Sequence, residues 1–538
     1  MKVNKVVFFA SAAVILLFVL FGAVFTETAH ALTTTTQTVI ATYLGWFYEL
    51  AMAFFLGFVI WLLFSRHADI RLGAPGETPK YNYVTWISML FSAGIGIGLL
   101  FFGVAEPLYH FTHPPHQHGF QPGSVHAAQH AIAVTFFHWG LHGWSLYVIV
   151  GLSLAYFGYR RDLPLTFRST LYPVLEERIH DWPGDLIEVL AVFGTMFGVA
   201  TSLGLGVIHV NTGLEMFGWL ESSARNQILL IAVITLGATI SVVSGLDRGI
   251  RRLSELNFAL GIVLLAIVFA LGPGLFLIRA YVQQIGYYLQ HLVQLSLTTG
   301  AYAPDAAGLS SNIDWQKAWT VFYWGWWISW CPFVGMFIAR ISRGRTIREF
   351  IVGVLLVPCA FITFWMSTFG NTALYLQKYD AGVAADVDLV ARITDAEGTF
   401  QFFRAFYVML ESLPWSTLTM GIATVSGVIY FITSSDSASL IIDILTSDND
   451  PDPPVAQRIF WALTEGAVAA VLIATGGKKA LTALQTGSIA AAVPFSLVAL
   501  AICYCLVVGL RRDEPSAEGR RMKEEGRRRR DEARRDDG

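Results

Sequence analysis

The sequence predicts an all-α polytopic membrane protein with twelve transmembrane helices, on three observations. Of the 538 residues, 54% are hydrophobic and only 14% are charged, whereas roughly a quarter of the residues of a soluble globular protein carry charge. The mean hydropathy is +0.55. Apolar runs of about twenty residues, the length of a membrane-spanning helix, recur along the chain. The formal net charge of −3 says little about partners, because the charges lie between these runs.

The first apolar run, residues 6–25, imitates a secretory signal peptide. Lys2 and Lys5 precede it, and Ala29, His30 and Ala31 resemble a cleavage site. Because the run is longer than a typical signal core, we expect it to be retained as the first helix. The eleven further predicted segments are residues 43–64, 83–109, 126–157, 186–217, 227–246, 254–279, 316–340, 347–375, 413–446, 457–475 and 480–510.

Basic residues recur in alternate loops between these segments. Loops 27–42 and 110–125 contain no Lys or Arg, whereas arginines follow segments 2, 4, 6, 8 and 12. By the positive-inside rule, this pattern predicts that both termini are cytoplasmic and that the chain spans the plasma membrane many times. Residues 281–314 are of mixed polarity, which favours an amphipathic helix lying in the membrane interface.

Two predicted segments contain helix-disrupting residues. Segment 3 carries Gly94, Gly96 and Gly98 in its middle, and each glycine weakens a helix by up to about 1 kcal/mol. Segment 8 carries Pro332, which removes a backbone donor and is expected to bend the helix. The two segments lie five apart, and a pair of interrupted helices in corresponding positions of two halves indicates a transporter binding site. Tight packing through small residues is the alternative for the glycines.

We therefore divide the chain into five parts. These are two N-terminal helices (1–80), a first group of five helices (81–280), the linker helix (281–314), a second group of five helices (315–510) and a charged cytoplasmic tail (511–538). The tail is expected to be a solvated segment that fixes topology or, alternatively, a sensor of anionic lipid or ionic strength.

Segment 8 contains a run of tryptophans. Trp324, Trp327 and Trp330 share one broad helix face, with Trp326 off to one side. Interfacial positions at a membrane surface explain Trp315 and Trp319 near the start of the segment, but not rings half-way along it. A cavity walled by indole faces suits quaternary ammonium ions, which carry charge and offer no hydrogen-bond donor.

Polar groups inside segment 10 predict a cation site. Thr433, Ser434, Ser435 and Asp436 stand together within an apolar span. The hydroxyls alone could bond back to their own helix, but an ionisable group in a span usually marks a pathway or a pair. Oxygen atoms of this kind suit a hard cation such as sodium.

Transition-metal and enzyme chemistry are not expected. His126 and His130, and His138 and His142, stand at i, i+4, but neither pair has an acidic partner nearby or a metal-binding motif. The four cysteines lie in apolar segments and are interpreted as small buried residues. No nucleophile, nucleotide or nucleic-acid motif is present, so we expect no cofactor.

The motif of segment 8 carries a family resemblance. W-G-W-W-I-S-W-C-P followed by R-I-S-R-G-R resembles the eighth helix of the betaine–carnitine–choline transporter (BCCT) family. The resemblance extends over all twelve segments. It implies a leucine-transporter-like fold of two inverted five-helix repeats, helices 3–7 and 8–12, with two extra N-terminal helices. It also implies a homotrimer in membrane lipid.

The resemblance further implies site residues. The substrate site would contain Trp139, Trp144, Tyr147, Trp326, Trp327, Trp330 and Gly98. One sodium site would use the carbonyls of Ser92 and Ile95 with Tyr430, Thr433 and Ser434, and a second would use Phe333 and Thr195, although Val199 stands where the family has a second hydroxyl.

These features predict sodium-coupled uptake of a quaternary ammonium osmolyte such as glycine betaine by alternating access. A proton-coupled choline carrier is one alternative, and ectoine or carnitine are alternative substrates. Family members of the proton-coupled kind tend to have an acidic residue where this chain has Gly98. A channel or an osmosensor without transport is a further alternative.

Overall fold

The computed structural model describes residues 3–94, 96–115, 119–244, 249–302, 306–379, 387–447, 453–476 and 480–513, and most of these residues are helical. Two isolated bridges, Arg71 with Thr346 and Thr394 with Phe400, are the extended pairings recorded there. The α-helices are α1 (Lys5–Val24), α2 (Thr26–Phe64), α3 (Tyr83–Gly94), α4 (Gly98–Thr112), α5 (Val125–Trp139), α6 (Leu141–Ala155), α7 (Phe167–Thr170), α8 (Tyr172–Leu175), α9 (Trp182–Met216), α10 (Ala224–Ser244), α11 (Gly249–Leu271), α12 (Gly274–Ser296), α13 (Ala306–Ala318), α14 (Thr320–Ile341), α15 (Ile347–Ile351), α16 (Val357–Leu374), α17 (Leu389–Ile393), α18 (Phe402–Glu411), α19 (Ser416–Leu445), α20 (Val455–Gly476) and α21 (Ala480–Arg512).

Eleven helical stretches among the described residues are long and apolar enough to cross a membrane. The predicted third segment, residues 83–109, is not among them because it is two short helices, α3 and α4, with Gly96 and Ile97 outside both. The glycine run therefore breaks the helix, as the sequence predicted.

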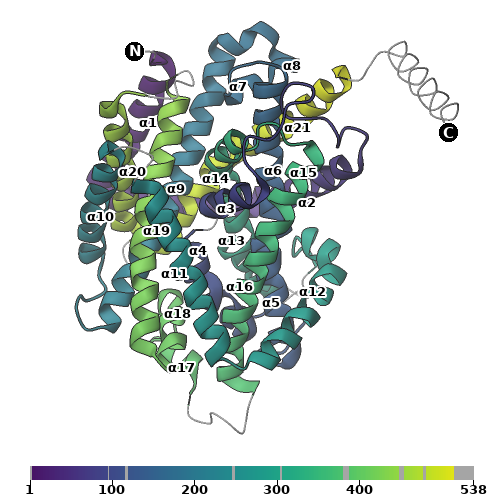
Figure 1. The fold of residues 1–538 in the computed structure, drawn as a ribbon. Helices are drawn as coiled ribbons and strands as arrows, with labels where there is room; N and C mark the ends of the chain where they lie inside the picture. The colour runs from purple at the N-terminus through teal and green to yellow at the C-terminus, as the bar shows by residue number, and fades with distance from the viewer. Residues whose placement is uncertain are drawn as a thin grey trace, which may run out of the picture.

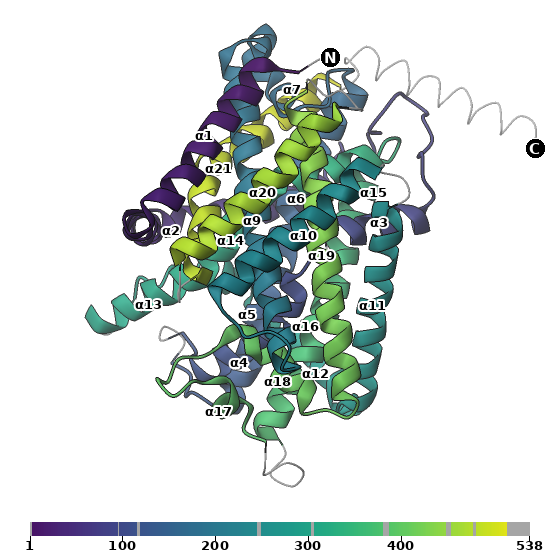
Figure 2. The same cartoon turned by 90° about the vertical axis from the view of Figure 1, so that its left-hand side faces the viewer.

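Two predicted boundaries are wrong. The loop expected at 27–42 is helical, because α2 runs for 39 residues. Figure 2 views the first part of α2 end-on, where this helix turns steeply away from α1. The predicted segment 254–279 ends at Leu271 instead, since Pro273 stands at the start of the next helix, α12. The linker helix therefore begins at Gly274 rather than at residue 281.

The predicted interruption of segment 8 is also wrong. Helix α14 is continuous through Pro332. Proline cannot donate to the carbonyl four residues earlier, which belongs to Ile328, and the Cys331 thiol donates to that oxygen instead, at 3.0 Å. Segment 4, predicted as one helix, is the one that breaks: α5 ends at Trp139 and α6 begins at Leu141, on either side of Gly140.

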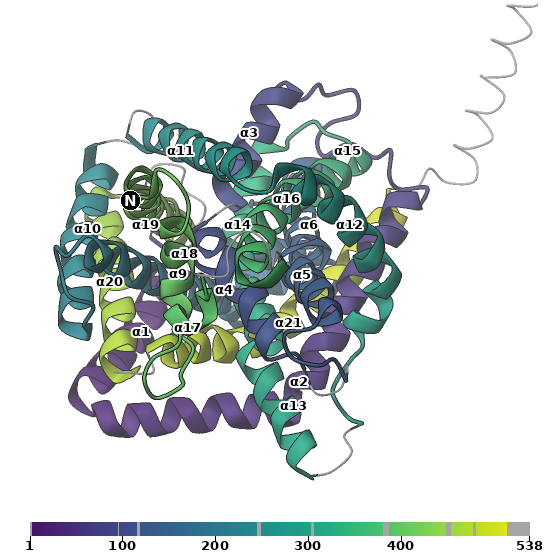
Figure 3. The same ribbon diagram turned by 90° about the horizontal axis from the view of Figure 1, so that it is seen from below.

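Helix α14 lies in the middle of the bundle, between α6, α9 and α21 (Figure 3). Every residue from Thr320 to Met336 is buried within the protein. The tryptophans of this helix therefore face other helices rather than lipid. Trp319 is buried as well, with its ring centroid 4.5 Å from that of His110, so this ring also packs on protein.

Basic loops that are distant in sequence meet at one end of the bundle (Figure 1). Arg343 pairs with Glu77 at 2.6 Å. A hydrogen bond from the backbone N–H of Ala74, together with Arg343, holds the pKa of the Glu77 carboxyl below its usual value. Arg160 and Arg161 both pair with Asp513, after the last helix, at 3.2 and 2.8 Å. The basic loops after segments 2, 4 and 8 thus lie together with the end of segment 12. Arg248, in the cluster predicted after segment 6, and the tail beyond Asp513 lie outside the described residues.

Candidate functional site

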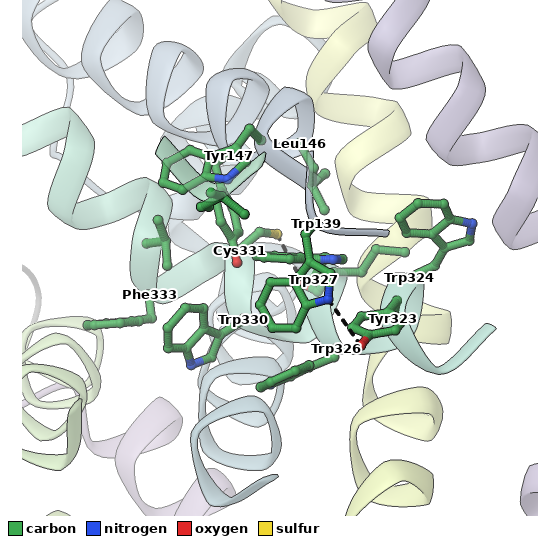
Figure 4. Close-up of a cluster of buried hydrophobic side chains, with 14 of the residues drawn as sticks. Trp139, Leu146, Tyr147, Tyr323, Trp324, Trp326, Trp327, Trp330, Cys331 and Phe333 are labelled. Atoms are coloured by element: carbon green, nitrogen blue, oxygen red, sulfur yellow. Dashed lines mark hydrogen bonds between the residues drawn. The ribbon is translucent and has the colours of Figure 1, made fainter. Parts of the chain in front are cut away.

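A small cavity lies where the broken segments 3 and 4 meet α14. It is lined by the α3–α4 connection, by both halves of segment 4 and by single residues of α9 and α19: Gly96, Ile97, Gly98, Trp139, Tyr147, Ser202, Trp326, Trp327, Trp330 and Ser434. Figure 4 shows the aromatic members of this set converging from α14 and from the two halves of segment 4.

The rings form a box of edges and faces. Trp139 stands at 85° to Trp326 and at 86° to Trp327, with centroids 5.9 and 5.6 Å apart. Tyr147 meets Trp327 at 69° and 5.4 Å. Edge-to-face contacts of this kind are favourable for the rings themselves, and they turn aromatic surfaces in several directions around one space.

Hydrogen bonds hold three of the indoles by their nitrogen atoms. Trp327 Nε1 donates to the carbonyl of His138 at 2.8 Å, an oxygen in the last turn of α5, where the break at Gly140 interrupts the helical bonding pattern. Trp326 Nε1 donates to Ser202 Oγ at 3.3 Å. Trp139 Nε1 donates to Glu106 Oε2 at 2.9 Å.

Two polar atoms of the lining have no hydrogen-bond partner. Trp330 Nε1 and Tyr147 Oη are both buried, and neither is paired with an atom of the described residues. Buried donors are rarely left unpaired, because desolvation without a new bond costs roughly 1–3 kcal/mol. The box therefore combines aromatic surface with donors that a polar group of a ligand could satisfy.

The cavity is nearly closed. Its volume is about 20 Å³, room for one water molecule and no more. Gly98 borders it so closely that a Cβ atom there would overlap the Trp139 ring and lie 2.9 Å from Trp326. A ligand larger than water can enter only if rings or helices move apart.

The structure brings together six of the seven residues predicted for the substrate site. Trp144 is the exception: it is buried behind Tyr147, at 5.4 Å and 84°, and does not line the cavity. Gly96, Ile97 and Ser202 also line the cavity, but they were not predicted as site residues. The glycine run marked the segment that contains the first two, whereas a lone serine in an apolar helix carried no signal.

The first predicted sodium site is described only in part. Ser434 lines the cavity, and Thr433 Oγ1 bonds back to the carbonyls of Ile429 and Tyr430 at 2.9 and 3.3 Å. Ser92 lies in the last turn of α3, and Ile95 lies outside the described residues. Ser434 therefore lies at the cavity next to the helix break, Thr433 is not among the lining residues, and the predicted carbonyl ligands are not placed.

The second predicted sodium pair lies at the contact of α9 and α14. Thr195 is fully buried, and its hydroxyl has no partner. Phe333 packs on Trp330, with centroids 5.5 Å apart. The two helices touch closely here, since a Cβ at Gly194 would lie 3.1 Å from the Ser329 carbonyl.

One histidine cluster among the described residues has the composition of a metal site. Ligand atoms of Glu106, His110 and His138 lie within 4.8 Å of one another. His138 Nδ1 and Glu106 Oε1 are only 2.6 Å apart, a hydrogen-bond distance, whereas two ligands of one zinc ion would be roughly 3 Å apart or more. The arrangement is that of a hydrogen-bonded pair.

Comparisons with known proteins identify the family. The model of the family described as "BCCT, betaine/carnitine/choline family transporter" matches residues 6–515. An uncharacterised transporter of Mycobacterium tuberculosis is 42% identical over 95% of this chain and 83% of its own. A glycine betaine transporter of Acinetobacter baylyi is 41% identical over 95% and 74%. The high-affinity choline transport protein of Escherichia coli is 38% identical over 95% and 73%.

These relatives are transporters and not enzymes, and the apolar helices of the fold are those of a multi-pass membrane protein. The family match spans both broken segments, the tryptophans of α14 and the hydroxyls of α19. The chain belongs to the betaine/carnitine/choline family of transporters.

Proposed function

We propose that this transporter takes up glycine betaine together with sodium by alternating access. The observation that carries the proposal is the aromatic box around a nearly closed cavity in which Trp330 Nε1 and Tyr147 Oη lack partners. A trimethylammonium group is attracted by indole faces, by up to about 2 kcal/mol when desolvated. The unpaired donors suit a carboxylate, which betaine has and choline lacks.

Sodium is the proposed coupling ion. Ser434, which lines the cavity beside the break in segment 3, and the preceding Thr433 are the proposed hydroxyl ligands, because a helix break leaves backbone carbonyls free to bind a cation. Thr195, with its unpaired buried hydroxyl, and Phe333 form the proposed second site. Gly98 adds no carboxylate that could carry a proton. No other cofactor is proposed.

The proposed arrangement in the cell follows the family resemblance. The helices form two inverted repeats of five in a leucine-transporter-like fold, in the plasma membrane, with the basic end of the bundle in the cytoplasm. Homotrimers in contact with lipid are proposed on the same ground.

The decisive experiment is uptake by purified protein in liposomes. Labelled betaine, choline, carnitine and ectoine are offered with and without a sodium gradient, and separately with a proton gradient. We expect betaine uptake that requires sodium. Equal uptake of betaine without sodium, driven by protons, would contradict the coupling, and exclusive uptake of choline would favour the alternative carrier.

Two sets of variants connect the uptake to the site. Trp330→Leu removes an indole from the box and should raise the apparent Michaelis constant by more than about tenfold. Trp324→Phe is the matched control, since Trp324 lies on the same helix outside the cavity, against Phe137. Replacing both Thr433 and Ser434 by Ala should raise the sodium concentration needed for half-maximal uptake, with little effect on betaine affinity at saturating sodium.

A further inference from the structure

Glu106 is a buried carboxylate that lies behind the aromatic box and that the proposed function does not use. It is fully buried on α4. A carboxylate in the interior of a membrane protein is costly unless hydrogen bonds or charges compensate it. Its surroundings therefore show what it stabilises.

Three donors from two other helices converge on this carboxylate. His138 Nδ1 lies 2.6 Å from Oε1, and Oε2 accepts from Trp139 Nε1 at 2.9 Å and from Tyr323 Oη at 2.5 Å. His138 is in turn held at Nε2 by Thr320 Oγ1 of α14, at 3.0 Å. Glu106 thus links α4 to the end of α5 and to the start of α14.

The bond to Trp139 connects this cluster to the cavity. Trp139 is the last residue of α5, next to the break at Gly140, and its ring forms one wall of the box. Tyr323 Oη also lies 3.1 Å from the same indole nitrogen. Rotation of the indole out of the wall would break a hydrogen bond to a carboxylate, which is among the stronger kinds.

The carboxylate also acts on the electrons of the ring. An indole N–H that donates to an anionic oxygen has a more negative π face, and the face of the ring is what attracts a cation. Orientation and polarisation therefore favour the same class of ligand.

We propose that Glu106 is a positioning residue for the cationic group of the substrate and that it acts through the Trp139 indole. The inference rests on the proposed function, since it takes the substrate to be a quaternary ammonium compound. It goes beyond that function because Glu106 does not border the cavity.

A double-mutant cycle in liposomes tests this inference against a purely structural role. The variants are Glu106→Gln, Trp139→Phe and the two combined, each checked for monodisperse elution. Glutamine keeps the shape but loses the charge and cannot accept from all three donors. We expect Glu106→Gln alone to raise the Michaelis constant for betaine about tenfold, with the maximal rate within about twofold of the wild type. In the Trp139→Phe background, which lacks the N–H, it should add less than about twofold.

The matched control is the same cycle with Trp461→Phe on α20, whose indole donates to Thr446 Oγ1 at 3.2 Å and whose effects should multiply independently with those of Glu106→Gln. If Glu106→Gln does not fold, Tyr323→Phe removes one donor from the same carboxylate and should raise the constant about threefold, again only while Trp139 is present. Equal effects with and without the Trp139 indole would overturn the inference alone. Absence of any quaternary ammonium uptake by the wild type would overturn the proposed function and this inference with it.

Discussion

Two parts of the molecule contain residues that disturb helices, and they respond differently. Segments 3 and 4 leave the helix, at the glycine run before Gly98 and at Gly140. Segment 8 stays helical through Pro332. The comparison distinguishes residues that only weaken a helix from residues whose missing side chain leaves space that neighbouring atoms fill.

The difference lies in what surrounds each position. Indole rings occupy the space where a side chain at Gly98 would be, and the Phe136 carbonyl lies only 2.5 Å from where a Cβ on Gly140 would be. At Pro332 the only loss is one backbone bond, and the freed carbonyl of Ile328 accepts from the Cys331 thiol. Membrane helices tolerate proline when a neighbouring side chain satisfies the backbone in this way.

The largest effect is expected at Gly98. Gly98→Ala places a methyl group into the Trp139 ring and near Trp326, and overpacking of this kind costs about 1–3 kcal/mol. The ratio of the maximal rate of betaine uptake to the Michaelis constant should fall by about tenfold or more. Gly421→Ala, on α19, is the control because nothing lies within 4 Å of its Cβ position. Normal transport by Gly98→Ala would contradict this prediction and would show that the rings of Trp139 and Trp326 can move aside for the methyl group.

A smaller but clear effect is expected at Gly140. A Cβ there meets a backbone oxygen that a change of rotamer cannot remove, so Gly140→Ala should shift the end of α5 and with it Trp139 and the His138 carbonyl that holds Trp327. We expect about three- to tenfold weaker betaine binding, measured by tryptophan fluorescence. Gly286→Ala on α12, in open space, should bind as the wild type does.

The smallest effects are expected at Pro332 and Cys331. Pro332→Ala restores the backbone N–H, and transport should stay within about twofold of the wild type, since the helix is already continuous. Cys331→Ala removes the donor to Ile328 and should cost about 1 kcal/mol of stability, seen as a lower thermal midpoint of the purified protein. Cys331→Ala should cost less when Pro332 is also Ala, because the backbone then supplies the bond. A tenfold loss of transport in Pro332→Ala would mean that Pro332 is needed for the site, as the glycines of segments 3 and 4 are expected to be.

The sequence by itself determined the features that depend on neighbours along the chain. Runs of apolar residues predict membrane helices because a bilayer accepts little else. The spacing of the tryptophans on α14 did not show which of them line the cavity, since Trp326 does and Trp324 packs on Phe137 instead. The glycine run was sufficient to predict the break in segment 3, and the motif around Pro332 was sufficient to indicate the family.

Only the tertiary structure decided how these elements meet. Glu106 and Trp139 are 33 residues apart, and Glu106 and Tyr323 are 217 apart, so no local pattern pairs them. Trp139 and Trp144 looked alike in the sequence, yet one forms the cavity wall and the other packs behind Tyr147, because the turn at Gly140 comes between them. Helix breaks depend on whether freed backbone groups and missing side chains find partners elsewhere in the bundle, and those partners come from other helices.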